Sequence, residues 1–129
     1  MHAAFLVGIS RYSDHTVKGV PNDLALLVCA LRHRNYPSTA IHVFDDSHTT
    51  CAALHTLFWA IQARYKDETS GSCYLHISAS GALSLGPIVG GILPSDGDAL
   101  DFSTAFSFPA LNQYLPIRPG IRVVMTIDT

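Results

Sequence analysis

Segments of strand length alternate with amphipathic segments along this chain. Residues 3–9 form a continuous apolar run, as in a strand that is buried on both faces, and residues 40–44, 73–78 and 121–127 are expected to form three further strands. Between them, apolar residues recur at helical spacing in two stripes: Leu24, Leu27, Val28 and Leu31, then Leu54, Leu57, Phe58, Ile61 and Tyr65. This alternation predicts an α/β domain over residues 1–129, with a mostly parallel sheet flanked by helices.

Turn and capping residues mark the boundaries of these elements. Residues 21–23 (Pro-Asn-Asp) open the first helix, and Thr49 or Thr50 can cap the second. Residues 79–108 are rich in Gly, Pro, Ser and Asp and predict a long loop, in which residues 88–93 are expected to form a small hairpin. Pro109 suits the first turn of a third helix, which would carry Leu111, Tyr114 and Leu115.

The composition indicates one folded domain. With 48% hydrophobic and 14% charged residues the chain is unlike a disordered one, and 129 residues are enough to bury a single core. The net charge of −2 and the absence of a Lys/Arg cluster argue against a nucleic-acid partner. Because no apolar run is long enough to span a bilayer and residues 1–8 lack the features of a signal peptide, we expect a cytoplasmic protein with no membrane partner.

Three scattered cysteines, Cys29, Cys51 and Cys73, are too few and too unevenly placed to predict a disulfide framework. We expect them to be reduced thiols that are buried as small apolar groups.

Polar residues follow all four predicted strands. They are Ser10 after the first strand, Asp45-Asp46 after the second, Ser78-Ala79-Ser80-Gly81 after the third and Asp128-Thr129 after the fourth. In parallel sheets of this kind, functional sites lie beyond the carboxyl ends of the strands. The sequence therefore predicts a site at this edge of the sheet.

The same segments, in order, resemble motifs of the caspase and metacaspase family of cysteine peptidases. Residues 6–12 (LVGISRY) and 17–23 (VKGVPND) resemble the first strand, its loop and the start of the first helix. Residues 78–81 (SASG) resemble the family's Ser-Gly-His-Gly-like motif, and residues 90–96 (GGILPSD) resemble a Gly-Gly-x-Leu-x-Pro-x-Asp-like segment. Residues 127–129 (IDT) match the strand end before the catalytic cysteine. The resemblance covers the large-subunit half of the family's domain and implies an incomplete three-layer caspase-like fold.

This resemblance implies nucleophilic catalysis, in which a cysteine thiolate attacks the scissile carbonyl and an imidazole transfers the protons. Ser80 stands at the position of the imidazole, and Gly81 at that of a backbone N–H donor to the oxyanion. A serine hydroxyl is not basic enough to act as the base near neutral pH. The loss of the imidazole base therefore lowers the rate by about 10²–10⁴-fold. Because no cysteine follows Thr129 either, we expect this chain to have no peptidase activity.

The resemblance to metacaspases also implies an acidic pocket that binds the Arg or Lys before the cut. Its carboxylates would be Asp23 and Asp128, and Ser78 would be a further pocket residue. Two carboxylates from separate loops suit a guanidinium, and no arginines match those with which true caspases bind aspartate. Two observations weaken this reading: Val20 stands where many metacaspases have Cys, and Asp23 can be read simply as an acid that stabilises a helix N-terminus.

Metal and other cofactor sites are not expected. Asp96, Asp98 and Asp101 are close in sequence but do not match the family's calcium positions. His48, Cys51 and His55 have a spacing that could bring three zinc ligands together, but no fourth ligand is evident.

Other catalytic readings are weaker. His76 lies about 13 Å from Ser80 along the strand, too far to replace the missing base, so we expect a buried structural histidine. Ser78 and Ser80 do not lie in a Gly-x-Ser-x-Gly motif, which argues against a serine hydrolase. A receiver domain would need an acidic pair after the first strand, where this chain has Ser10-Arg11.

The apolar segment 121–127 would invite pairing if it formed an edge strand. We therefore expect either the missing C-terminal half of a longer protein or a second chain to pair with it. The first functional hypothesis is a caspase-like endopeptidase domain that acts on a peptide or protein substrate and is inactive as written. The second is a pseudo-peptidase that serves as a regulatory or interaction module, and the third is a flavodoxin-like domain that binds a small ligand.

Overall fold

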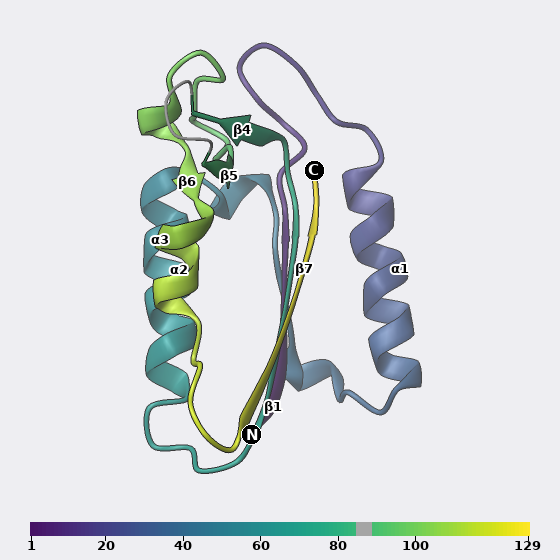
Figure 1. Ribbon diagram of the computed structural model, residues 1–129. Coiled ribbons are helices and arrows are strands. Elements are labelled where there is room, and N and C mark those ends of the chain that lie inside the picture. Colours follow the sequence, from purple (N-terminus) through teal and green to yellow (C-terminus); the bar gives the residue numbers. More distant parts are fainter. Residues whose placement is uncertain (85–88) are drawn as a thin grey trace.

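The computed structural model describes residues 1–84 and 89–129 and has three layers (Figure 1). Its central sheet consists of β1 (His2–Gly8), β2 (Ile41–Phe44), β3 (Gly71–Ser78) and β7 (Ile121–Asp128). These strands are parallel and lie in the order β2-β1-β3-β7. Helix α1 (Val20–His33) covers one face, and α2 (Cys51–Arg64) and α3 (Phe108–Tyr114) cover the other. The predicted parallel sheet flanked by helices is confirmed.

A small antiparallel sheet lies near the carboxyl ends of the parallel strands (Figure 1). It contains β4 (Gly81–Leu83), β5 (Gly90–Ile92) and β6 (Phe106–Ser107), in the order β4-β5-β6. The hairpin expected within residues 88–93 is wrong for residues 90–92, which form a single strand that pairs with β4 on one side and β6 on the other; Ile88 lies outside the described residues. Gly91 suits this strand because a Cβ there would lie 2.7 Å from the Phe106 carbonyl oxygen.

Local hydrogen bonds explain where the helices begin. The Thr50 side chain caps α2 by accepting from the Ala53 N–H at 3.2 Å, which decides between the two threonines expected there. Asp96 also accepts from the Cys51 N–H at 2.8 Å, so the acidic residue of the 90–96 segment ties the long loop to the start of α2. Short 3₁₀ helices at Ser38–Ala40, Asp46–His48 and Phe102–Thr104 complete the connections.

Both faces of β1 are buried, as its apolar run predicts. Ala4 and Leu6 pack against α1 residues that include Leu24 and Leu31. Alternate residues of β1 face the larger cluster, together with α2, α3, β3 and the small sheet: Phe5, Val7, Leu54, Phe58, Ile61, Leu75, Ile77, Ile92 and Leu111. The second apolar stripe is confirmed throughout, since all five of its residues are buried.

The three thiols differ in exposure. Cys73 is buried, which raises its pKa to about 11, and Cys51 is half-buried. The prediction of buried thiols is wrong for Cys29, which is exposed because it lies on α1 outside the apolar stripe. All three are free cysteines.

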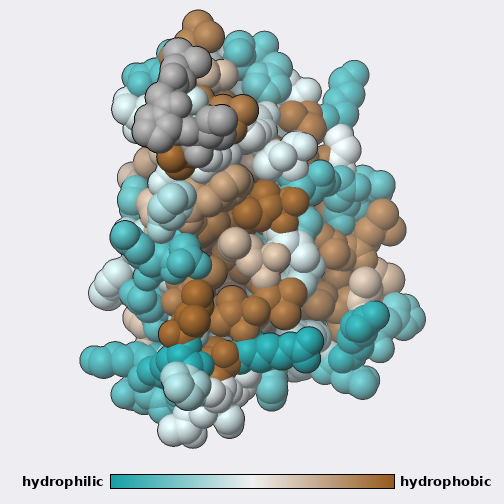
Figure 2. All heavy atoms as spheres, viewed as in Figure 1, coloured by the Kyte–Doolittle hydropathy of each residue, from teal (hydrophilic) through white to brown (hydrophobic). Residues whose placement is uncertain are grey.

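Strand β7 lies at one edge of the four-stranded sheet. Val123, Met125 and Ile127 pack partly against the larger cluster, whereas Val124, on the α1 side, is 38% exposed. Apolar side chains gather across the middle of the face that β7 crosses (Figure 2). The edge that the sequence predicted to be prone to pairing is therefore incompletely covered within the described residues.

Candidate functional site

The strand ends bring the predicted pocket residues together. Gly8, Ser78 and Asp128 are Cα partners across β1, β3 and β7, so their positions form one row at the carboxyl edge of the sheet. The start of α1 packs closely against this row, because a Cβ on Gly8 would lie only 2.4 Å from Leu24 Cδ1. This approach brings Asp23, in the first turn of α1, to the same edge.

His76 reports that the two carboxylates converge. His76 is 9% exposed, and its Nδ1 lies 2.7 Å from Thr126 Oγ1. Burial lowers the pKa of His76, while the negative charges of Asp128 and Asp23 oppose this effect. These two carboxylates come from separate elements, β7 and α1, and both favour the charged form of the imidazole. The expectation of a buried histidine is confirmed.

The acidic residues at this edge are free to meet a ligand. Asp128 is exposed, Asp23 is half-buried and Ser78 is buried. Within residues 1–84 and 89–129, no Lys or Arg side chain forms an ion pair with either aspartate. The edge therefore presents two unpaired carboxylates beside a buried hydroxyl, a donor set that suits a guanidinium or an ammonium group.

Asp46 fixes the loop that follows β1. Its Oδ1 accepts from the backbone N–H groups of Ser10 (2.8 Å) and Arg11 (2.9 Å), and its Oδ2 accepts from Ser10 Oγ (2.5 Å). Burial alone would raise the pKa of Asp46, but these hydrogen bonds outweigh it and the pKa lies below its ordinary value. This carboxylate holds the end of β1 rather than a ligand.

Ser80 lies in a network that the sequence analysis did not foresee. Its N–H donates to the Tyr12 hydroxyl (2.8 Å), which in turn donates to the Leu93 carbonyl (3.1 Å). Ser80 Oγ lies 3.1 Å from His15 Nε2, and Asp14 Oδ1 lies 2.6 Å from His15 Nδ1. Asp14 and His15 lie in the loop after β1, at the carboxyl edge of the sheet. This position in the chain is the sequence signal that could have pointed to them.

Gly81 lies beside the end of β7. A Cβ at Gly81 would be 3.4 Å from Thr129 Cβ, an ordinary contact, so Thr129, the residue after β7, lies next to Gly81. All five predicted site residues therefore lie at the carboxyl edge, with Asp23, Ser78 and Asp128 on the α1 side.

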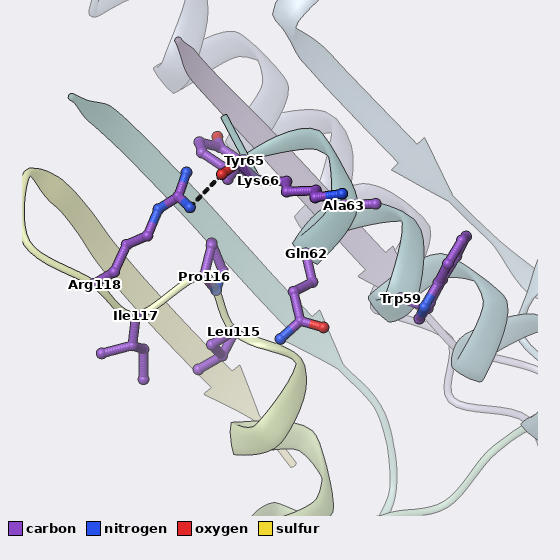
Figure 3. Close-up of a pocket in the computed structure, with 9 residues that line it drawn as sticks. All are labelled: Trp59, Gln62, Ala63, Tyr65, Lys66, Leu115, Pro116, Ile117 and Arg118. Atoms are coloured by element: carbon purple, nitrogen blue, oxygen red, sulfur yellow. Dashed lines mark hydrogen bonds between the residues drawn. The ribbon is translucent and has the colours of Figure 1, made fainter. Parts of the chain in front are cut away.

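A separate pocket lies between the second half of α2 and the segment after α3 (Figure 3). Arg118, which lines this pocket, donates hydrogen bonds to the carbonyl oxygens of Lys66 (2.5 Å) and Glu68 (2.6 Å). Figure 3 shows the hydrogen bond to Lys66. Because its Nη1 and Nη2 atoms donate to backbone carbonyls, we assign Arg118 a structural role.

Residues 1–84 and 89–129 contain no group of three His, Cys, Asp or Glu side chains arranged to hold a metal ion. His48 and His55 have separate partners, Ser47 and Tyr114. None of the helices described combines the length and apolar character needed to cross a membrane.

Comparisons with known proteins support the fold. Neither the known protein families nor the curated proteins give a match to this sequence. Among solved structures, the chain is similar to protein GSU0716 from Geobacter sulfurreducens, with a TM-score of 0.74 and 17% sequence identity. The match covers 99% of this chain and 50% of that one, so this chain spans about half the length of its structural neighbour. The likeness establishes a shared three-layer α/β fold.

Proposed function

We propose that this chain is the large-subunit part of a caspase-like cysteine endopeptidase domain, with an acidic pocket for Arg or Lys, and that it is inactive as written. The observation that carries the proposal is the placement of Ser78 and Asp128 in one row at the carboxyl edge, with Asp23 in the first turn of the helix that packs against this row. A guanidinium between two carboxylates gains charge-assisted hydrogen bonds that a neutral side chain cannot make.

The position of Ser80 and Gly81 supports the same reading. Thr129, the residue after β7, lies beside Gly81, and the resemblance puts the nucleophile of the family directly after it. A thiolate there would have the Gly81 N–H beside it but no imidazole at position 80. This arrangement fits a domain that recognises a basic peptide without cleaving it.

Peptide binding tests the pocket. We expect a fluorescent peptide with a single arginine to bind more tightly than the same peptide with citrulline, which has nearly the same shape but no charge. Asp23→Asn and Asp128→Asn should each weaken binding about tenfold, as expected for the loss of a charged hydrogen-bond partner. Asp67→Asn, which removes an exposed carboxylate after the end of α2, is the control of equal charge. Equal binding of arginine and citrulline peptides would refute the pocket.

Catalysis is tested in a longer chain that continues with cysteine after Thr129. Introducing Ser80→His there should produce cleavage after Arg or Lys, and Asp128→Asn should remove that cleavage. Cleavage after acidic residues would contradict the proposed specificity.

The half-covered edge of β7 favours a second candidate, a pseudo-peptidase that acts as an interaction module. In that case a partner strand would pair with β7, and Asp23→Asn and Asp128→Asn would leave partner binding unchanged.

A further inference from the structure

The loop after β1 delivers an imidazole to Ser80. Residues 10–17 form a narrow turn, closed by hydrogen bonds from Val17 N–H to Ser10 O (2.7 Å) and from Tyr12 N–H to His15 O (2.9 Å). The His15 ring stacks on Tyr12, with ring centroids 4.6 Å apart and an interplanar angle of 12°. Since the Tyr12 hydroxyl is itself anchored to Ser80 and Leu93, the imidazole is held at a fixed place over the end of β3.

The hydrogen bonds set the tautomer of this imidazole. An ionised Asp14 only accepts, so the proton shared at 2.6 Å belongs to His15 Nδ1. The hydrogen bond to His15 holds the pKa of Asp14 below its ordinary value, which keeps the carboxylate ionised. In the neutral imidazole with its proton on Nδ1, Nε2 carries the lone pair, and it lies 3.1 Å from Ser80 Oγ, where it can accept the hydroxyl proton.

The backbone next to Ser80 offers a donor for an oxyanion. Gly81 pairs with Ile92, and the Leu93 N–H donates to Ser80 O at 2.8 Å. In an antiparallel ladder this pattern makes Gly81–Ile92 a non-hydrogen-bonded pair, so the ladder leaves the Gly81 N–H unused. The N–H of the residue after a nucleophilic serine is the usual oxyanion donor in hydrolases with a serine at a strand end.

We propose that Ser80, His15 and Asp14 form a nucleophile–base–carboxylate relay that hydrolyses small carboxylic esters through an acyl-Ser80 intermediate. This activity does not rest on the peptidase proposal, since it uses no cysteine and none of the acidic pocket residues. Ser80 does not lie in a Gly-x-Ser-x-Gly motif, but that motif marks only one of the folds that carry such a serine. The relay needs only the geometry, which the fold assembles from residues 65 positions apart.

The reaction balances with water as the second reactant. Ser80 Oγ bonds to the ester carbonyl carbon as its proton passes to His15 Nε2; the bond to the alcohol then breaks, and the alcohol leaves with that proton. Water next attacks the acyl carbon and gives a proton to Nε2. The Oγ–acyl bond breaks, the proton returns to Ser80 and a carboxylic acid is released. His15 and Gly81 are both exposed, so a small ester can reach Oγ from solvent.

The test is labelling by a fluorophosphonate probe, located by mass spectrometry, together with hydrolysis of 4-nitrophenyl acetate by the full chain. We expect the probe on Ser80. His15→Ala should slow labelling by about 10²–10⁴-fold, and added imidazole should restore part of it. Asp14→Asn should slow it less, because Asp14 is exposed and water can partly replace its carboxylate.

The chain offers a matched control in the 3₁₀ helix Asp46–His48. Ser47 Oγ lies 2.7 Å from His48 Nδ1, and Asp45 Oδ1 lies 3.8 Å from the same nitrogen. Because the serine and the carboxylate are both nearest to Nδ1, they do not lie on opposite ring nitrogens as a relay requires. His48→Ala should leave labelling of Ser80 and the hydrolysis rate unchanged. Equal labelling of Ser47 and Ser80, or a folded His15→Ala variant that labels at the original rate without imidazole, would overturn the proposal.

Discussion

The Tyr12 hydroxyl is the contact whose removal gives the most informative result. It accepts from the Ser80 N–H at 2.8 Å and donates to the Leu93 carbonyl at 3.1 Å, and so joins three segments of the chain. Tyr12→Phe keeps the ring, and with it the stacking on His15, but leaves both backbone groups without this partner. Leu93 is 2% exposed, whereas Ser80 is half-buried, so water can replace the hydroxyl for Ser80 more readily than for Leu93.

A buried polar group left without a partner costs about 1–3 kcal/mol, and here one of the two groups is largely protected from water. We therefore expect Tyr12→Phe to lower the free energy of unfolding by about 2 kcal/mol, out of a total of about 5–15 kcal/mol for a domain. Urea unfolding measures this as a lower midpoint with an unchanged slope. Tyr36→Phe is the control, because the Tyr36 hydroxyl makes no hydrogen bond within the described residues. A loss below about 0.5 kcal/mol, the range of neutral surface changes, would refute the bridging role.

Three further predictions concern the same edge of the sheet. The pKa of Asp46 is lower in the folded state, so its hydrogen bonds stabilise the fold above the unfolded pKa of 3.8. This contribution disappears as the pH falls through the lower folded pKa. In Asp46→Asn, the free energy of unfolding should therefore fall less steeply at acid pH, as urea unfolding at several pH values would show. Asp128→Asn should lower the pKa of His76 further, because it removes a charge that favours the imidazolium, and titration of the ring by NMR would contradict the convergence if this pKa stayed the same. Gly8→Ala should cost about 1–3 kcal/mol in urea unfolding by forcing Leu24 away from β1, and a neutral result would mean that α1 packs more loosely than described.

Local periodicity was sufficient to predict most of the fold. The α2 stripe succeeded because its five residues all face one cluster, so burial repeats with the period of the helix. The small sheet could not be predicted in the same way. Residues 90–92 pair with segments on both sides of them in the chain, and no short-range signal specifies which distant strand lies next to Gly91.

The candidate site was likewise predictable where local sequence patterns place its residues, and not where it depends on long-range contacts. Asp128 and Ser78 were found because each follows or ends a strand, and parallel strands bring such positions to one edge. Asp23 is identified through a family resemblance, and the packing of α1 against Gly8 brings it to the same edge as Asp128. His15 was missed because its partner is Ser80, and the contact depends on how the turn after β1 folds over the end of β3.

The charges at this edge help to choose between ligand classes. Five carboxylates lie in the first turn of α1 or in the residues that end or follow β1, β2 and β7. They belong to Asp14, Asp23, Asp45, Asp46 and Asp128. The same segments contain only two Lys or Arg side chains, Arg11 and Lys18. Asp46 is neutralised in part by the N–H groups that it binds, but Asp23 and Asp128 form no ion pair with Lys or Arg in the described parts of the chain. A potential of this sign repels the phosphates of a flavin or nucleotide and attracts cationic ligands, more strongly at low salt. It therefore disfavours the flavodoxin-like reading, agrees with a pocket for Arg or Lys, and implies that neutral or cationic esters should react at Ser80 faster than anionic ones.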